Sequence, residues 1–428
     1  IFIFNKFEAK LVDCHFLRCH SAGSCGGFSS ANGASVEMIR GSIMGCSGTS
    51  AAGVNIYGLS TLRLVDVTIA ECRATKDGGD GGSIYVRADA SVLTMSGGAI
   101  RDCEATSQGG GLSVRGTAQA HLHGVAVQRC KALAAGGMAL YGNVSLVDVS
   151  IEDCYAPERA AMSGGGSLRA ERVRVARARL NIPTYLTGTS TWTDSTFVDC
   201  SAGPQIVRGA HSFTRLNVRG ATNYGLSAYI GVAVVIDSHI ADGHGTCVAA
   251  EKGALILRNV TLSNCSAPEK PYVSLESAED AAAFQAELLT LEPACEAERS
   301  GALISVGDAA VTAPLSVRGL RVVEPAACAS ADLTIFSDHV RPRNCSDAED
   351  VCGIAATCTE VQPLPSAAPN LTTVDCACTG DPNPSGTSGA LAPYGFDPSS
   401  LGLPDGIDVS DIGLPGSIID YCVCCSTR

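Results

Sequence analysis

The chain has 428 residues, of which 46% are hydrophobic but only 5% aromatic and 17% charged, while glycine (47) and cysteine (21) are unusually frequent. Its net charge of −13 argues against a nucleic-acid partner, because phosphate binding needs a basic surface. No apolar run approaches the roughly 20 residues of a membrane helix, so no membrane span is expected in this chain. So few large aromatic and charged side chains favour a regular architecture built from small residues.

The first residues, IFIFNKFEAK, contain no initiator methionine and none of the features of a signal peptide. We interpret the chain as a processed protein or a fragment that begins within a strand.

A short motif recurs along the chain: an apolar residue, two variable residues and a cysteine. It occurs eight times, ending at Cys19, Cys46, Cys72, Cys103, Cys130, Cys154, Cys200 and Cys265. Degenerate copies with Ala178, Ala221 and Gly243 at the cysteine position fill the gaps, so successive marker positions lie 21 to 31 residues apart. This near-constant period over most of the chain is the signature of a solenoid.

Each repeat reads L-x-L-x-D-V-x-I-x-x-C-x-A, followed by a Gly-rich turn and I-x-V. Three short stretches with alternating apolar residues predict three strands per coil, and the glycine clusters suit the corners between them. The sequence therefore predicts an all-β protein, a right-handed parallel β-helix of about 11–13 coils.

The pattern C-x-A…GGG-[IL]-x-V, as in the segment from Cys103 to Val114, resembles the repeats of the polymorphic outer-membrane proteins. More broadly, it resembles the right-handed pectin-lyase-like β-helix. The resemblance covers roughly residues 1–335, and it implies a β-helix domain over that range.

The eight marker cysteines recur at one place in each coil, so their thiols are expected to stack inside the helix about 4.8 Å apart. One interpretation is a ladder of buried free thiols that pack as small hydrophobic groups. The other is a set of disulfides between adjacent coils, because the spacing lies within the Cα range of a disulfide, although parallel Cβ directions are unfavourable for one.

A second column of residues lies six positions before each marker, and several of its members are charged. It reads Asp13, Arg40, Asp66, Gly97, Gly124, Asp148, Arg172, Asp194, Arg215, Asp237 and Asn259. Because Asp and Arg alternate between 148 and 237, one hypothesis is a ladder of ion pairs between consecutive coils. The alternative is a series of independent solvated turn residues, since Asp is common in turns.

The repeat pattern lapses after Cys265. Residues 277–289, SAEDAAAFQAELL, carry an S-x-x-D capping signature and alanine-rich helical spacing. We therefore predict a helical loop insertion at about 277–290. Strand alternation resumes in ALISV and LSVRGLRVV, so one or two further coils are expected before residue 335.

The C-terminal part differs in composition from the repeats. Cys345, Cys352, Cys358, Cys376 and Cys378, within residues 341–380, resemble an EGF-like module. The resemblance implies the disulfides Cys345–Cys358 and Cys352–Cys376, and a bridge from Cys378 to Cys422 across a long Pro- and Gly-rich loop. Residues 381–428 hold that loop and a terminal cysteine cluster. Zinc ligation is the competing interpretation, but no paired C-x2-C and no nearby His supports it.

Five Asn-X-Ser/Thr sequons, more than composition alone would supply, indicate passage through a secretory compartment. They are Asn143, Asn259, Asn264, Asn344 and Asn370. Together with the cysteine-rich tail, they predict an extracellular or cell-surface glycoprotein.

The pectin-lyase-like fold includes polysaccharide hydrolases and lyases, so we searched for catalytic residues. Gly243-His244-Gly245 resembles the G-H-G element of the polygalacturonases, but the preceding coil, residues 217–229, supplies no carboxylate partner. The string Asp77-Gly-Gly-Asp80-Gly-Gly hints at Ca²⁺, but a single copy does not make a calcium-binding repeat. We therefore expect no catalytic, cofactor-binding or metal-binding residues.

The function predicted from the sequence is that of a non-enzymatic extracellular structural or adhesive protein, for cell-surface display or for assembly into a filament such as a flagellar hair. An uncapped first coil would leave strand edges for a precursor or partner to cover. The expected partners are other extracellular proteins, copies of the chain itself, or glycans. The alternative is a carbohydrate-active enzyme, whose activity would depend on residues such as Asp194 or Asp237.

Overall fold

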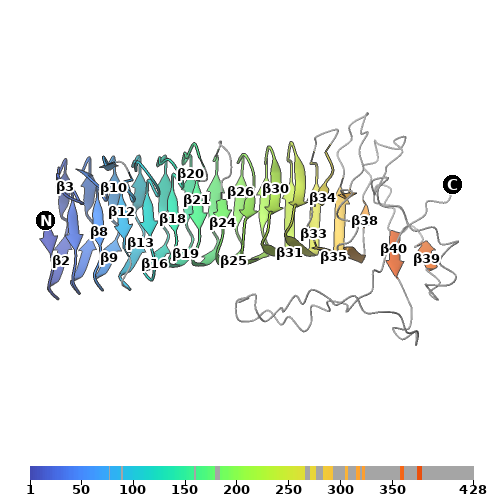
Figure 1. The fold of residues 1–428 in the computed structure, drawn as a ribbon, viewed down its shortest axis with the longest axis horizontal. Helices are drawn as coiled ribbons and strands as arrows, with labels where there is room; N and C mark the ends of the chain where they lie inside the picture. The colour runs from blue at the N-terminus through green and yellow to red at the C-terminus, as the bar shows by residue number, and fades with distance from the viewer. Residues whose placement is uncertain are drawn as a thin grey trace.

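The computed structural model of the chain is a parallel β-solenoid (Figure 1). It describes residues 1–76, 78–87, 90–158, 161–178, 184–265, 270–275, 283–292, 304–306, 315–318, 321–322, 357–360 and 374–377. Strands from successive coils stack side by side along one long axis, with the N-terminal coil at one end (Figure 1).

Each coil contributes strands to parallel ladders, which agrees with the prediction of three strands per coil. The first ladder is a 13-stranded sheet formed by β1 (Phe2–Ile3), β4 (Phe28–Ser30), β8 (Val54–Ile56), β12 (Ile84–Val86), β15 (Leu112–Val114), β18 (Met138–Leu140), β21 (Met162–Gly164), β24 (Thr184–Leu186), β27 (Pro204–Ile206), β30 (Tyr224–Ala228), β32 (Thr246–Ala250), β34 (Val273–Leu275) and β36 (Ile304–Val306).

The second ladder consists of five-residue strands: β2 (Glu8–Val12), β5 (Ser35–Ile39), β9 (Thr61–Val65), β13 (Val92–Ser96), β16 (Gln119–His123), β19 (Asn143–Val147), β22 (Ser167–Glu171), β25 (Thr189–Thr193) and β28 (Ala210–Thr214). The third consists of three-residue strands: β3 (His15–Leu17), β6 (Ser42–Met44), β10 (Thr68–Ala70), β14 (Ala99–Arg101), β17 (Ala126–Gln128), β20 (Ser150–Glu152), β23 (Arg174–Ala176), β26 (Thr196–Val198) and β29 (Asn217–Arg219). A short extra pair, β7 (Ser47–Gly48) and β11 (Arg73–Ala74), lies just after two marker cysteines.

The core consists of columns of like residues that face inward from consecutive coils. At the centre of the three-residue strands, Ile43, Ile69 and Ile100 pair in register, and each side chain is fully buried. Burying one such side chain contributes about 1.5–3 kcal/mol. Because a one-residue slip would turn every inward side chain outward, these columns also fix the register of the coils.

Two corners of each coil are made by single residues in the left-handed backbone conformation. One is the column of charged residues predicted from the sequence, for example Asp66 at φ 52° and Arg215 at φ 53°. The other, which sequence reasoning missed, is the residue just before each marker: Arg18, Gly45, Glu71, Asp102, Arg129, Asp153, Arg177, Asp199, Gly220, Asp242 and Asn264, all with φ between 49° and 67°. The backbone turns sharply at these positions, which explains why Asp, Asn and Gly are frequent there.

Asp199, at φ 52°, tests this corner geometry because its side chain is exposed. We expect Asp199→Gly to change the free energy of unfolding by less than about 1 kcal/mol, and Asp199→Val to lower it by about 1–2 kcal/mol, because a β-branched residue strains the left-handed conformation. Denaturant unfolding of the two variants measures the difference. Equal stability of the two variants would contradict the role of the backbone at this corner.

The last coils merge the second and third ladders into long strands. These are β31 (Val232–Ala241), β33 (Ala254–Ser263) and β35 (Ala283–Glu292), and β35 pairs with both β37 (Leu315–Arg318) and β38 (Arg321–Val322). The strand β35 corrects the predicted helix at 277–290 over residues 283–290; residues 277–282 lie outside the described part of the chain.

Tertiary pairing explains why this segment is a strand despite its helical propensity. The edge of β33 offers a continuous row of backbone partners, and Phe284, Ala286 and Leu289 then face the core at 0–1% exposure. Leu288, at φ 55°, occupies the left-handed corner position that Asn259 holds one coil earlier.

Beyond β38, the structure describes one antiparallel pair, β39 (Thr357–Glu360) and β40 (Val374–Ala377), in which Cys358 lies opposite Cys376. The predicted boundary at 335 and most of the predicted EGF-like segment, 341–380, lie outside the described residues, as does all of 381–428. Within the described residues no helix is long and apolar enough to cross a membrane.

Candidate functional site

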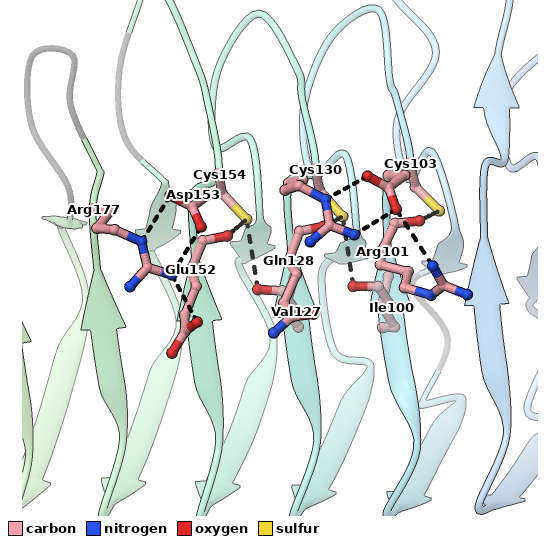
Figure 2. A network of polar contacts seen from close by, with 12 residues as sticks. Ile100, Arg101, Cys103, Val127, Gln128, Cys130, Glu152, Asp153, Cys154 and Arg177 are labelled. Atoms are coloured by element: carbon pink, nitrogen blue, oxygen red, sulfur yellow. Dashed lines mark hydrogen bonds and ion pairs between the residues drawn. The ribbon is translucent and has the colours of Figure 1, made fainter.

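The marker cysteines form an internal column on the inner side of the second corner (Figure 2). In the first six coils Cys19, Cys46, Cys72, Cys103, Cys130 and Cys154 are free thiols; all but the first are buried. Each buried thiol lies between two carbonyl oxygens. Cys103 Sγ, for example, is 3.2 Å from the oxygen of Arg101 and 3.9 Å from that of Ile69 in the preceding coil. Cys200 is also free and buried.

This environment suppresses thiol reactivity. Hydrogen bonding to the next thiol of the column, followed by burial, raises the pKa of Cys46, and burial is the main cause of the raised pKa of Cys103 and Cys200. Burial also raises the pKa of Cys25, outside the column, to about 11. Because the thiolate is the nucleophile and the metal ligand, these cysteines are suited to packing rather than to catalysis.

Cys265 differs from the other marker cysteines and corrects the predicted eight-member column. It forms a disulfide with Cys247 of β32, with the two Cα atoms 5.7 Å apart. Cys247 follows a coil whose marker position is Gly243, where the column has no thiol. The bond therefore joins the marker position after β33 to the strand β32 of the 13-stranded sheet, near the C-terminal end of the described solenoid.

The charged corner residues form bidentate pairs between adjacent coils. Arg172 donates to Asp148 at 2.6 and 3.0 Å, and Arg215 and Arg40 bind Asp194 and Asp13 in the same way. The pattern is one of separate pairs rather than a continuous ladder. The side chains of these three pairs are 39–61% exposed, so solvent screens their attraction and each pair contributes little to the stability of the fold.

The second corner, at the residue just before each marker, carries similar arginine–aspartate pairs, which were not predicted from the sequence. Arg129 donates to Asp102 at 2.7 and 2.8 Å. Arg177 donates to Asp153 at 2.9 and 2.8 Å (Figure 2). The hydrogen bonds from arginine are the main reason why the pKa of Asp102, like those of Asp13, Asp148 and Asp194, lies below its usual range. A search for charge alternation immediately before the marker would have found it.

Three of the five sequon asparagines fall on described residues. Asn143 is exposed at the first position of β19. Asn259 and Asn264 occupy the two left-handed corners of one coil, and their Nδ2 atoms donate to Asp237 at 2.7 Å and to Asp242 at 2.9 Å. Asn344 and Asn370 lie outside the described residues, as do the predicted disulfide cysteines Cys345, Cys352, Cys378 and Cys422.

The residues considered for catalysis are not brought together. His244 is exposed, and Asp194 and Asp237 are occupied at the corners by Arg215 and Asn259. Asp80, of the glycine-rich string, accepts a hydrogen bond from Arg115 at 2.8 Å, while Asp77 lies outside the described residues. Among the described residues, no group of three or more His, Cys, Asp or Glu side chains could hold a metal ion.

The outer face of the 13-stranded sheet changes along the solenoid. In the early coils its outward central residues, such as Asn55 and Ser113, are at most 1% exposed. Loop residues lie over them, and Ser24 Oγ is 3.4 Å from Asn55 Nδ2. Where the repeat shortens to 21–22 residues, the equivalent residues Gln205 and Ser227 are only half-buried. The sheet face is therefore more open at β27 and β30, whereas the equivalent Ser274 of β34 is buried again.

A shallow hollow forms on this open face. Gln205, Ser227 and Glu251 line it together with Tyr224 and Tyr229, whose side chains are 38% and 40% exposed. Aromatic faces beside amide, hydroxyl and carboxylate groups suit binding of a polar ligand with apolar faces. The two tyrosines of the segment 217–229 were the sequence signal for this site, and their position at strand ends could not be recognised without the coil register.

The hollow is a candidate binding site on the described part of the chain, whereas the cysteine column and the corner pairs connect one coil to the next. Comparison of the chain with protein-family models, with curated proteins and with solved structures finds no match.

Proposed function

We propose that this chain is a non-enzymatic structural or adhesive glycoprotein of the extracellular space. In this proposal a stiff β-helix of the pectin-lyase-like type, with repeats like those of the polymorphic outer-membrane proteins, precedes an EGF-like module. The chain would serve in cell-surface display or in an extracellular filament. Its partners would be other extracellular proteins, copies of itself, or glycans.

The observation that carries the proposal is the coupling between coils. The parallel strands, the inward apolar columns and the corner pairs such as Asp148–Arg172 all connect one coil to the next. A solenoid whose neighbouring units are linked in this way holds its length and presents a regular surface, which suits a spacer or an adhesive rod. The exposed side chain of Asn143 provides a site where a glycan can be accommodated.

Secretion and glycosylation can be tested directly at Asn143. We expect the protein from its native source to carry an N-glycan on the peptide containing Asn143, detected by mass spectrometry. We also expect Asn143→Gln, expressed through a secretory pathway, to lose the mass of one glycan while remaining secreted. Immunolabelling of intact native cells should place the protein at the surface. Native protein without any glycan, labelled only in permeabilised cells, would overturn the proposal.

The hollow beside Tyr224 and Tyr229 supports a second candidate, a carbohydrate-active enzyme. Glu251 is its acidic side chain, and hydrolysis of glycosides ordinarily uses two carboxyl groups. Incubation with a panel of acidic and neutral polysaccharides distinguishes the two functions. The structural proposal predicts no depolymerisation by the intact protein, whereas activity that is lost in Glu251→Gln would establish the enzyme instead.

A further inference from the structure

An apolar patch lies on the outside of the solenoid, where the long strand β31 pairs with β28 on one side and with the long strand β33 on the other. Its members are outward-facing residues that pair in register, namely Ala210, Val232, Val234, Ile236, Ala254 and Ile256. The equivalent central positions of earlier strands hold exposed polar side chains, such as Arg63 and His121. We call this set the outer apolar patch.

The patch is buried although it faces away from the core. Val232, Val234 and Ile256 are 8%, 2% and 9% exposed, and they form a hydrophobic cluster separate from the main core. The sequence shows the same feature independently, because VAVVI (232–236) and ALIL (254–257) are continuous apolar runs rather than alternating ones. Continuous runs are typical of strands that are covered on both faces.

The described strands that pair with β31 and β33, namely β28, β29 and β35, lie beside them in the same sheet, so strand pairing does not cover the outer face of the patch. At the edge of the patch, Arg258 Nε is buried without a hydrogen-bond partner among the described residues, and the Glu287 carboxylate is 3.9 Å away. A buried guanidinium nitrogen calls for an acceptor. The covering segment should therefore bring apolar side chains together with an acidic group.

We propose that residues 381–428, the C-terminal segment of this chain, bind back across the outer apolar patch. This segment contains six aspartates, and its only basic residue is Arg428. Its negative charge complements the positive charge of Arg258. It also carries two similar apolar stretches, Leu401-Gly-Leu-Pro and Ile412-Gly-Leu-Pro, joined by the alternating run Ile407-Asp-Val-Ser-Asp-Ile. Proline-containing segments are already extended, so they lose little conformational freedom when they bind.

The position of the patch along the solenoid makes this contact short-range. The strand β33 pairs with β35, which pairs with β38 (Arg321–Val322) near the end of the described solenoid. The sequence continues toward residue 428 from that end of the solenoid, whereas the early coils, with polar outer faces, form its opposite end (Figure 1). The contact would join the tail to the coils nearest to it.

Photo-crosslinking of the intact chain tests the proposal. A benzoylphenylalanine residue is introduced in place of Val234, and, as the matched control, in place of His121 at the equivalent position of β16. After illumination, we expect the first variant to crosslink to peptides from 381–428 of the same chain, and the second to give no such crosslink. An equimolar mixture of isotopically light and heavy protein identifies crosslinks between chains.

A second measurement does not depend on the bulky probe. We expect Val234→Asp to raise the rate at which limited proteolysis removes the C-terminal segment by at least about tenfold, since it places a charge in an apolar contact, and His121→Asp to leave this rate unchanged. Crosslinks between light and heavy chains would overturn the proposal in favour of self-association. Crosslinks to the solenoid alone, or no crosslink at all, would also overturn it.

Discussion

Replacement of Trp192 by alanine is expected to lower the free energy of unfolding by about 3–5 kcal/mol. Trp192 is the only tryptophan, and it is fully buried in β25. Its ring stacks on Phe213 of the next coil at 6.2 Å between centroids, and Phe197 lies 5.7 Å away. Truncation leaves a cavity in the core of this coil. Since each coil packs only against its two neighbours, few other side chains can move in to fill it.

Trp192 also makes a hydrogen bond inside the core. Its Nε1 donates to Ser190 Oγ at 2.9 Å. Trp192→Phe keeps most of the apolar contact and loses only this hydrogen bond, so we expect a smaller loss of about 1–2 kcal/mol. The matched control is Tyr229→Ala, an aromatic truncation at an exposed position, which should cost less than about 1 kcal/mol.

Urea unfolding followed by circular dichroism measures these losses, since the variants lack the tryptophan fluorescence signal. Hydrogen exchange then locates them, and we expect protection to fall most in β22, β25 and β28, the strands on either side of Trp192. A loss below 1 kcal/mol for Trp192→Ala, or one no larger than that of Tyr229→Ala, would contradict a packing role for this side chain.

The sequence predicted the solenoid because its information is local and repeated. One cysteine per coil, an apolar residue three positions earlier and glycines at the corners specify the path of each coil without reference to the others. The strand β35 was missed for the opposite reason. Residues 283–290 have good helical propensity, and only the edge of β33, which is not visible in that segment, determines that they form a strand.

The side-chain contacts were harder to predict than the fold, because they form between residues of adjacent coils. The pair Asp148–Arg172 was proposed from charge alternation in one column, whereas the equivalent pair Asp102–Arg129 was missed because that column lay next to the more conspicuous cysteines. The Cys247–Cys265 bond joins a strand residue to a marker residue, and no repeat pattern relates these two positions. Burial of Val234 was likewise not predicted, because alternation assigns it to the outer face.

A buried histidine should make the stability of the solenoid depend on pH between about 6.5 and 4. His211 in β28 is 1% exposed, and its in-register neighbours, Ser190 and Ala233, are uncharged. Its Nε2 lies 2.8 Å from the carbonyl oxygen of Arg208, which can only accept, so Nε2 carries the proton. Its Nδ1, 2.8 Å from Ser190 Oγ, is then the acceptor of the serine hydroxyl.

Protonation of Nδ1 would place a charge in the core and remove that acceptor. Burial accordingly lowers the pKa of His211 to about 4, from an ordinary value of 6.5. The unfolded chain therefore binds a proton at a higher pH than the folded chain, and stability falls as the pH decreases through this window. The stability contributed by neutral His211 is fully present above pH 6.5. A pKa difference of this size between the folded and unfolded chains corresponds to a loss of about 3 kcal/mol by pH 4.

Urea unfolding at pH 7, 6, 5 and 4.5 tests this expectation with His211→Leu and His211→Gln, neither of which can titrate. Both should be less stable than the parent chain at pH 7, because Ser190 or Arg208 loses a partner, but their stability should change much less over the window. The corner aspartates do not obscure the result. Their pKa values lie below the ordinary 3.8, so their pairs with arginine stabilise the fold above that pH and are lost only below it. An equal fall of stability in the parent chain and in both variants would show that His211 is not the group that titrates.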